Sequence, residues 1–228
     1  MILGKDARKK RRPAIEKRAC GPTRFAKITP LALLAAAGLL TLIGCGAARP
    51  SKYYQLTVPG EQTISQNADP VAATLLLGPL LASHLYREDR IVYSANGEQM
   101  GTYEYHRWAE PPTEMIEEVL LRSLRASGRY KAVYMHRSDA TGDFALRGRL
   151  YDFKEVSGSP ILARVTFDME LRDLKTGATA WTHFYTHDEP AGGKDVPSIV
   201  AALDRNVQAG VKEVLTGLEQ YFATHPVK

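Results

Sequence analysis

Residues 161–172 read ILARVTFDMELR, and apolar and polar side chains alternate along this segment. The apolar set runs from Ile161 to Leu171 at every second position, and the intervening positions are polar from Arg164 to Arg172. Successive side chains of a strand point to opposite faces, so the pattern predicts a strand with one face in a core and the other in water. A half-solvated strand of this kind favours antiparallel neighbours.

Other strands are expected on both sides of this segment. Leu77 and Gly78 precede Pro79, and the residue before a proline avoids the helical region, so one strand is expected to end at Gly78. Asn96 and Gly97 tolerate the positive φ angles of a type I′ turn, which predicts a β-hairpin around them. The expected strands are residues 53–56, 75–78, 91–94, 99–106, 130–136, 143–154, 161–172 and 178–188.

Two segments repeat apolar side chains every three or four residues, which marks one face of a helix. The first is 113–127, where Thr113 is expected to cap the amino end and Gly128 to stop the helix. The second begins near Pro197 and extends to about residue 221. The pattern predicts one α+β domain, with a mixed, mostly antiparallel sheet of about six or seven strands and two amphipathic helices on one face.

Residues 31–45 read LALLAAAGLLTLIGC, an uncharged and mostly apolar run that ends in a cysteine. As a helix, the run before the cysteine spans about 21 Å, which is short of the ~30 Å hydrocarbon core of a bilayer and favours a signal peptide. Leu42, Ile43 and Gly44 before Cys45 resemble the bacterial lipobox, in which the cysteine is acylated after cleavage. The alternative is a cysteine that lies in an apolar stretch by chance.

Charge divides the chain at this point. Residues 1–44 hold ten Lys or Arg and two acids, a net charge of +8, whereas residues 45–228 hold twenty basic and twenty-three acidic residues, a net charge of −3. The basic character therefore belongs to the segment that would be removed, and nucleic acid is not expected as a partner. Outside Cys45, the only cysteine is Cys20 in that segment, so no disulfide is expected in the mature chain.

The expected organisation has four parts. Residues 1–44 form a lipoprotein signal peptide with a long basic n-region, and residues 45–73 form a lipidated tether and linker. Residues 74–222 form the folded domain, and residues 223–228 form a C-terminal tail.

Motifs for catalysis are missing from the sequence: there is no GxSxG elbow, Walker loop, HExxH or CxxC. No catalytic residue, metal site or cofactor is therefore expected, apart from a covalent lipid on Cys45. His183 and His187 are the best metal candidates, but a spacing of four residues on a strand separates them by about 13 Å, too far to share one ion. An aromatic sheet surface is the expected setting for both.

The stretch from Arg107 to Pro111 holds one of the two tryptophans, Trp108. Arg107 and Glu110 are close enough in sequence to form an ion pair, and Pro111 and Pro112 constrain the start of the following helix. Two interpretations remain open. Either Trp108 packs under the helix and the ion pair fixes the corner, or the stretch is an exposed recognition loop.

Several of these motifs together resemble the ABC-type transport auxiliary lipoprotein component family, whose PqiC-like members belong to MCE-protein intermembrane transport systems. Residues 80–84 depart from the family pattern, which usually has a proline-containing loop there. The candidate interface or structural residues that carry the resemblance, beside the lipobox, are Tyr53, Tyr54, Leu56, Gly78, Pro79, Arg107, Trp108, Ala109, Glu110 and Pro111.

The resemblance implies a non-enzymatic docking component of a lipid or hydrophobic-substrate transporter, anchored in the outer membrane and facing the periplasm. Its partners would be an MCE-domain protein and an ABC permease and ATPase. Gly46 follows the lipidated cysteine where inner-membrane lipoproteins of enteric bacteria have Asp, so outer-membrane sorting is favoured. The alternatives are a lipid-anchored periplasmic hydrolase and a structural envelope lipoprotein.

Aromatic residues are frequent on the expected strands, and two helices can cover only one face of the sheet. Tyrosines on the other face or at the edges would stay partly exposed, and exposed aromatic patches tend to mark interfaces. A homo-oligomeric ring is therefore expected. The aromatic residues in question are Tyr93, Tyr103, Tyr105, Tyr130, Tyr134, Tyr151, Trp181 and Tyr185.

Overall fold

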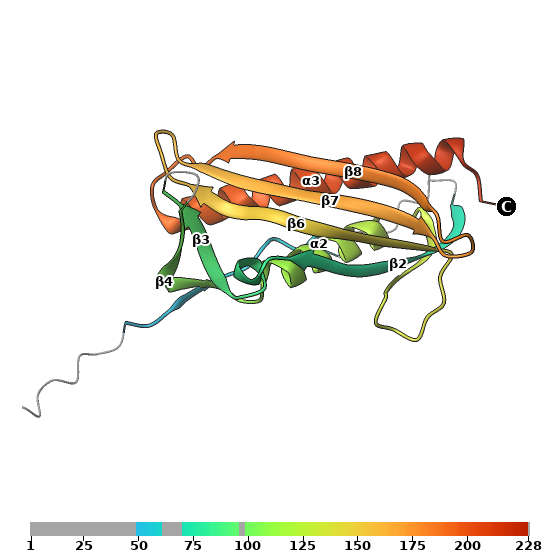
Figure 1. Ribbon diagram of the computed structural model, residues 1–228, viewed down its shortest axis with the longest axis horizontal. Helices are drawn as coiled ribbons and strands as arrows, with labels where there is room; N and C mark the ends of the chain where they lie inside the picture. Colours follow the sequence, from blue (N-terminus) through green and yellow to red (C-terminus); the bar gives the residue numbers. More distant parts are fainter. Residues whose placement is uncertain (1–48, 61–69, 96–98, 228) are drawn as a thin grey trace, which may run out of the picture. The chain divides into compact units, whose positions relative to one another are not determined.

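A computed structural model describes residues 49–60, 70–95 and 99–227, so the predicted lipobox and Cys45 lie outside the described residues. Within these ranges eight strands form one mixed sheet, and two α-helices pack on the same face of it (Figure 1). The helices are α2 (Pro112–Ala126) and α3 (Val196–Thr224), with a short 3-10 helix, η2 (His84–Tyr86). The strands are β1 (Lys52–Tyr54), β2 (Val71–Ala82), β3 (Arg90–Ser94), β4 (Met100–Trp108), β5 (Tyr130–Met135), β6 (Phe144–Val156), β7 (Leu162–Asp173) and β8 (Thr179–Pro190).

Strand β6 organises the sheet. Its first half pairs with β2, which continues to β5, and its last residues pair with β3, which continues to β4 and β1. Its other edge pairs with β7, and β7 in turn pairs with β8. The long pairings along β6, β7 and β8 are antiparallel, while β2 and β3 both run parallel to β6. The predicted α+β class, mixed sheet and pair of helices are confirmed, with eight strands instead of six or seven.

Strand β7 follows the predicted alternation. Ala163, Val165, Phe167, Met169 and Leu171 are all buried, with none more than 2% exposed. They face α3, which packs across β7 and β8. The opposite face of the strand carries the charged residues, as the sequence predicted.

The prediction that a strand ends at Gly78 is wrong, because β2 continues through Pro79 to Ala82. The register between β2 and β6 shifts between Leu77 and Leu80, and such a bulge accommodates the missing N–H of Pro79. The Leu80 N–H donates to Glu117 Oε1 of α2 at 2.8 Å. The Glu117 side chain therefore accepts the Leu80 N–H where the ladder between β2 and β6 is interrupted.

The folded part also begins before residue 74. Strand β1 pairs with the end of β4, and β2 begins at Val71, so both contribute residues from the predicted linker. The strands β3 and β4 are antiparallel with Ser94 opposite Met100, as in the predicted hairpin. The turn at Asn96 and Gly97 lies outside the described residues.

Helix α2 buries the predicted apolar stripe but begins differently. Pro111 is the N-cap residue and makes no side-chain cap, and Thr113 is a buried residue of the first turn instead of the cap. Pro112 occupies the first helical position, where its missing N–H costs no intrahelical bond. Gly128 has a φ of 62°, which agrees with its predicted role as the stop. The buried stripe is Met115, Ile116, Val119, Leu120 and Leu124.

Helix α3 is held on the sheet by a buried amide. Asn206 is 1% exposed, and its side-chain N–H groups donate to the carbonyl oxygens of Ala163 and His187, both at 2.9 Å. Its Oδ1 accepts the Tyr185 hydroxyl at 2.7 Å. The amide thus fixes the helix against β7 and β8 by polar contacts as well as by apolar packing. No helix in the described ranges is long and apolar enough to cross a membrane.

Replacing Asn206 by alanine is expected to lower the free energy of unfolding by about 1–3 kcal/mol, because the Tyr185 hydroxyl and the carbonyl groups of Ala163 and His187 each lose a partner. Urea denaturation followed by circular dichroism measures the change. Thr216→Ala, at an exposed position of the same helix, is the control and should behave like the wild type. An unchanged denaturation midpoint in the Asn206 variant would contradict the proposed role of the amide.

Candidate functional site

Strand β1 brings two sequence motifs together at one corner of the domain. Tyr53 lies opposite Arg107 and Tyr54 lies opposite Trp108 in a parallel pairing. The Ala109 N–H donates to the Tyr54 carbonyl oxygen at 2.7 Å, which extends the pairing by one bond. Most of the residues that carry the family resemblance are therefore neighbours in space.

Trp108 is part of the core at this corner. Its side chain is 1% exposed, and its ring centroid lies 5.2 Å from that of Phe153 on β6. Leu56, just after β1, is 2% exposed and belongs to the same core. This burial favours the structural interpretation of the corner over an exposed recognition loop.

The expected ion pair between Arg107 and Glu110 does not form. Arg107 Nη1 lies 2.9 Å from Asp89 Oδ1, and the Trp108 N–H donates to the Asp89 carbonyl oxygen at 2.7 Å. Strand β4 continues through Trp108, so Glu110 lies beyond its end while Asp89 precedes the neighbouring strand. Ala109 and Glu110 are exposed, and Pro111 is half-buried at the start of α2.

The chain that leaves β1 is bound to α3. The Thr57 N–H and hydroxyl donate to the two carboxylate oxygens of Asp204 at 3.0 and 2.6 Å. Gln208 Nε2 donates to the Thr57 carbonyl oxygen at 2.7 Å. We call these three hydrogen bonds the Thr57 clamp. Together with the β1–β4 pairing, the clamp attaches the amino-terminal segment to the domain on both sides of Leu56.

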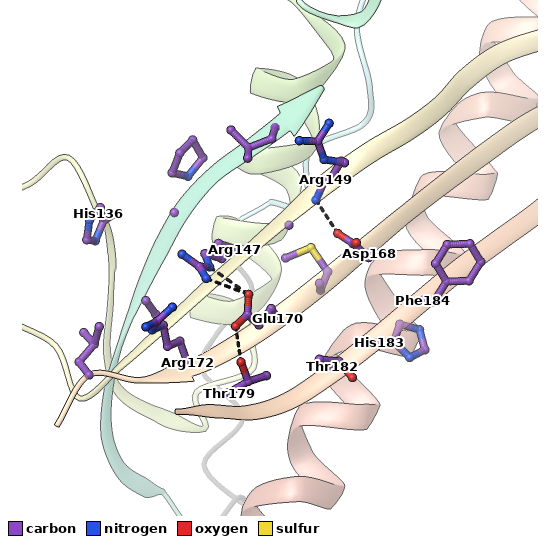
Figure 2. A pocket seen from close by; sticks show the side chains of 17 residues that line it. His136, Arg147, Arg149, Asp168, Glu170, Arg172, Thr179, Thr182, His183 and Phe184 are labelled. Carbon is purple, nitrogen blue, oxygen red and sulfur yellow. Dashed lines mark hydrogen bonds and ion pairs between the residues drawn. The ribbon is translucent and has the colours of Figure 1, made fainter. Parts of the chain in front are cut away.

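A second surface lies on the sheet face opposite the helices. Strands β2, β6, β7 and β8 line an open hollow of about 1130 Å³ (Figure 2). Gly78 and Pro79 lie here and not at the β1–β4 corner, so the predicted site residues occupy two places. Gly148 also lines the hollow, where an added Cβ would meet the Asp168 carbonyl oxygen at 2.2 Å. The close approach of β6 and β7 therefore requires glycine at this position.

Two carboxylates of β7, Glu170 and Asp168, line the hollow and accept hydrogen bonds from neighbouring strands. The Arg147 guanidinium donates to Glu170 Oε2, and the Thr179 hydroxyl donates to Glu170 Oε1 (Figure 2). The Thr179 hydroxyl and then Arg147 lower the pKa of Glu170. Asp168 accepts the Arg149 backbone N–H and the Tyr151 hydroxyl, both at 2.8 Å.

Large apolar side chains border these charges. Leu81, Leu174 and Phe184 are 55%, 40% and 62% exposed, although all three line the hollow. Arginine beside exposed aromatic and aliphatic side chains is typical of protein recognition surfaces. The hollow therefore has the chemistry of a binding surface.

Sequence reasoning missed the hollow but not the polar face that contains it. The alternation in residues 161–172 placed Asp168 and Glu170 on the outer face, and a similar alternation at Arg147 and Arg149 could have placed those residues on the neighbouring strand. The register that joins these residues across strands, and the need for Gly148, depend on the β6–β7 pairing.

The two candidate histidines lie on the helix side of β8. The His183 ring stacks on Trp181 with centroids 5.7 Å apart, and its Nε2 lies 3.4 Å from Glu213 of α3. His187 lies 3.7 Å from Glu189. Among the described residues, no group of three or more His, Cys, Asp or Glu side chains could hold a metal ion.

Glu117 accepts the N–H of Leu80 at the bulge of β2, and its burial predicts that the stability of the fold depends on pH. Burial raises the pKa of Glu117 above its ordinary value of 4.5, so the folded protein binds this proton more tightly than the unfolded protein. Stability from this group is therefore present at low pH and is lost as the pH rises from near 4.5 through the folded pKa.

Glu117→Gln keeps an acceptor for the Leu80 N–H but has no charge to bury. Its stability relative to wild type is expected to increase from about pH 4 to about pH 7, which thermal unfolding across this interval measures. The exposed Glu219→Gln is the control and should follow the wild-type curve. A constant difference between the Glu117 variant and wild type would contradict the prediction.

These features define an α+β domain with a buried structural corner at β1 and β4 and an open hollow on the sheet face opposite the helices. The sequence model of the ABC-type transport auxiliary lipoprotein component family matches residues 54–214, and the chain belongs to this family. The resemblance identified from the motifs is thereby confirmed.

Two solved structures are similar to this chain. The crystal structure of protein XCC0632 from Xanthomonas campestris has 23% sequence identity and a TM-score of 0.64, covering 73% of this chain and 93% of that one. The crystal structure of an uncharacterized protein has 12% identity and a TM-score of 0.58, covering 73% of this chain and 97% of that one. Both likenesses show the shared fold. The sequence has no significant match among curated proteins.

Proposed function

We propose that this protein is an outer-membrane-anchored, periplasm-facing auxiliary component of an MCE/ABC-type system that moves lipid or another hydrophobic substrate between membranes. The match to the family over residues 54–214 is the observation that carries the proposal, because it covers most of the chain after the predicted lipobox. The lipobox at residues 42–45 supports the lipid anchor, and Gly46 supports sorting to the outer membrane.

The proposed role is non-enzymatic docking. Lipid cannot cross an aqueous gap unshielded, so a transporter in one membrane needs a fixed point of contact at the other. An MCE-domain protein would bridge the gap, and an ABC permease and ATPase would drive transport. The hollow with Leu81 and Phe184 supports this role, since its exposed apolar side chains suit contact with a protein.

Affinity purification of the full-length, carboxyl-terminally tagged protein from its native host tests the proposal. After crosslinking in intact cells, an MCE-domain protein should be recovered and the tagged protein should fractionate with the outer membrane. Recovery with inner-membrane fractions would refute the location, and recovery without any MCE-domain or ABC-transport protein would refute the transport role.

We further propose that the protein forms a homo-oligomeric ring. Tyr134 and Tyr151 are 42% and 46% exposed, as a contact surface requires, whereas Tyr185 is buried under α3 and contributes nothing to such a surface. Head-to-tail contacts close into a ring when the rotation between copies allows it. Light scattering of residues 46–228 at up to about 100 μM should show a species larger than a monomer, and a monomer throughout, with no ring on membranes, would end this proposal.

A further inference from the structure

Strand β1 is an edge of the sheet, and the first described residues of the chain, 49–51, lead directly into it. Its Tyr53 is 63% exposed, and Arg49 and Lys52 are exposed as well. The Arg49 guanidinium lies over the ring of Tyr105 on β4, 5.9 Å from the ring centroid. We call Arg49, Lys52, Tyr53 and Tyr105 the anchor-side patch.

The length of the chain limits how far this patch can lie from the predicted lipid. Arg49 follows Cys45 by four residues, and an extended chain gains at most about 3.6 Å per residue. Arg49 therefore lies within about 14 Å of the cysteine in any conformation of the intervening segment. Because Arg49 contacts Tyr105, the same limit brings β4 close to the membrane surface.

The patch cannot move away from the domain, because its ends are attached. The β1–β4 pairing holds residues 52–54 against β4, and the Thr57 clamp holds the segment that follows. A short tether that leaves from a fixed edge strand restricts the orientation of the whole domain. Once Cys45 is lipidated, the edge that carries β1 therefore stays close to the membrane.

The chemistry of the patch suits the headgroup layer of a phospholipid membrane. Tyrosine is enriched at membrane–water interfaces, and Lys and Arg attract anionic headgroups. The Tyr105 hydroxyl donates a hydrogen bond to Glu104, the one acidic residue of β4. Arg107 contributes less, because its guanidinium already pairs with Asp89.

We propose that the anchor-side patch binds the headgroups of phospholipids around the lipid anchor, so that the domain sits on the membrane along its β1 edge. The inference rests on the proposed lipidation of Cys45 and adds a second contact to it. Two signals of this kind, a lipid chain and a cationic surface, give firmer attachment than either one alone.

Site-specific fluorescence in reconstituted vesicles tests the proposal. The full-length protein is expressed, processed and lipidated, then labelled at a single new thiol at Tyr53→Cys with an environment-sensitive dye. Thr216→Cys is the control, because Thr216 is exposed on α3 and lies about 12 Å along the helix beyond Gln208, the last residue of α3 in the Thr57 clamp. Vesicles contain phosphatidylethanolamine and phosphatidylglycerol, with a headgroup-attached quencher.

The dye at position 53 should be quenched at least about threefold more strongly than the dye at position 216, because electrostatic and headgroup contacts fall off within ~10 Å. Arg49→Glu combined with Lys52→Glu should reduce quenching at position 53 by about half while lipidation remains complete. Lys52→Cys provides a second labelling site should Tyr53→Cys fold poorly.

Equal quenching at positions 53 and 216 in the lipidated protein would overturn the inference and leave the lipid anchor intact. An unlipidated product by mass spectrometry would instead refute the anchor on which both proposals rest. If the dye at position 53 is also buried in the lipid-free chain in solution, the patch contacts a second copy of the protein instead of lipid. That result also overturns the inference.

Discussion

Replacing Cys45 by alanine is expected to abolish lipidation and to remove the protein from the outer membrane. The thiol is the acceptor for the acyl group, and no other side chain in the lipobox can replace it. Stable attachment needs more than one acyl chain, because a single chain binds a bilayer only marginally. The variant should therefore remain an uncleaved precursor or lose its outer-membrane location.

Metabolic labelling with palmitate and membrane fractionation measure this outcome. Cys20→Ala is the matched control, since Cys20 lies in the predicted signal peptide, and it should leave labelling unchanged. Palmitate incorporation at the normal level in the Cys45 variant would refute the lipobox. A loss of labelling in both variants would point to failed export and require a rescue by Cys20→Ser.

Replacing Trp108 by alanine is expected to lower the free energy of unfolding by about 3–5 kcal/mol, the largest stability effect at the β1–β4 corner. The ring is 1% exposed and packs on Phe153, so its removal leaves a cavity between the corner and β6. Chemical denaturation of the domain, followed by circular dichroism, measures the loss. Trp108→Phe retains part of the ring volume and should lose less.

Tyr53→Ala is the control for this corner. Tyr53 is next to Tyr54, the pairing partner of Trp108, but its side chain is 63% exposed. Its stability should change by no more than about 0.5 kcal/mol, as is usual for surface positions. A stable Trp108→Ala variant that has lost transport would favour the recognition interpretation over the structural one. Equal losses in the two variants would show that the corner unfolds as a unit whichever side chain is removed.

Local patterns predicted the elements whose periodicity is long and regular. The alternation at residues 161–172 became β7, and the apolar stripe of α2 is buried as predicted, because each pattern repeats often enough to define one face. The end of β2 could not be predicted in this way. The rule about Pro79 is local, whereas the bulge that accommodates it depends on Glu117 of α2, far along the chain.

Candidate site residues show the same difference. The importance of Trp108 could be inferred from its rarity and its position before Pro111, but its burial depends on Phe153. The partner of Arg107 is Asp89, which only the β3–β4 pairing brings near. A nearby carboxylate in the sequence is therefore a poor guide to ion pairs when the two residues lie at the end of a strand.

The attachment of β1 also determines how the protein would respond to a mechanical force. If a partner pulls the domain away from the membrane, tension enters the domain at Arg49 and runs along β1. Side-by-side pairing with β4 means that such a pull shears several backbone hydrogen bonds at once, instead of opening them one after another. Behind them, Asp204 and Gln208 hold Thr57, so the tension passes on to the longest helix of the domain.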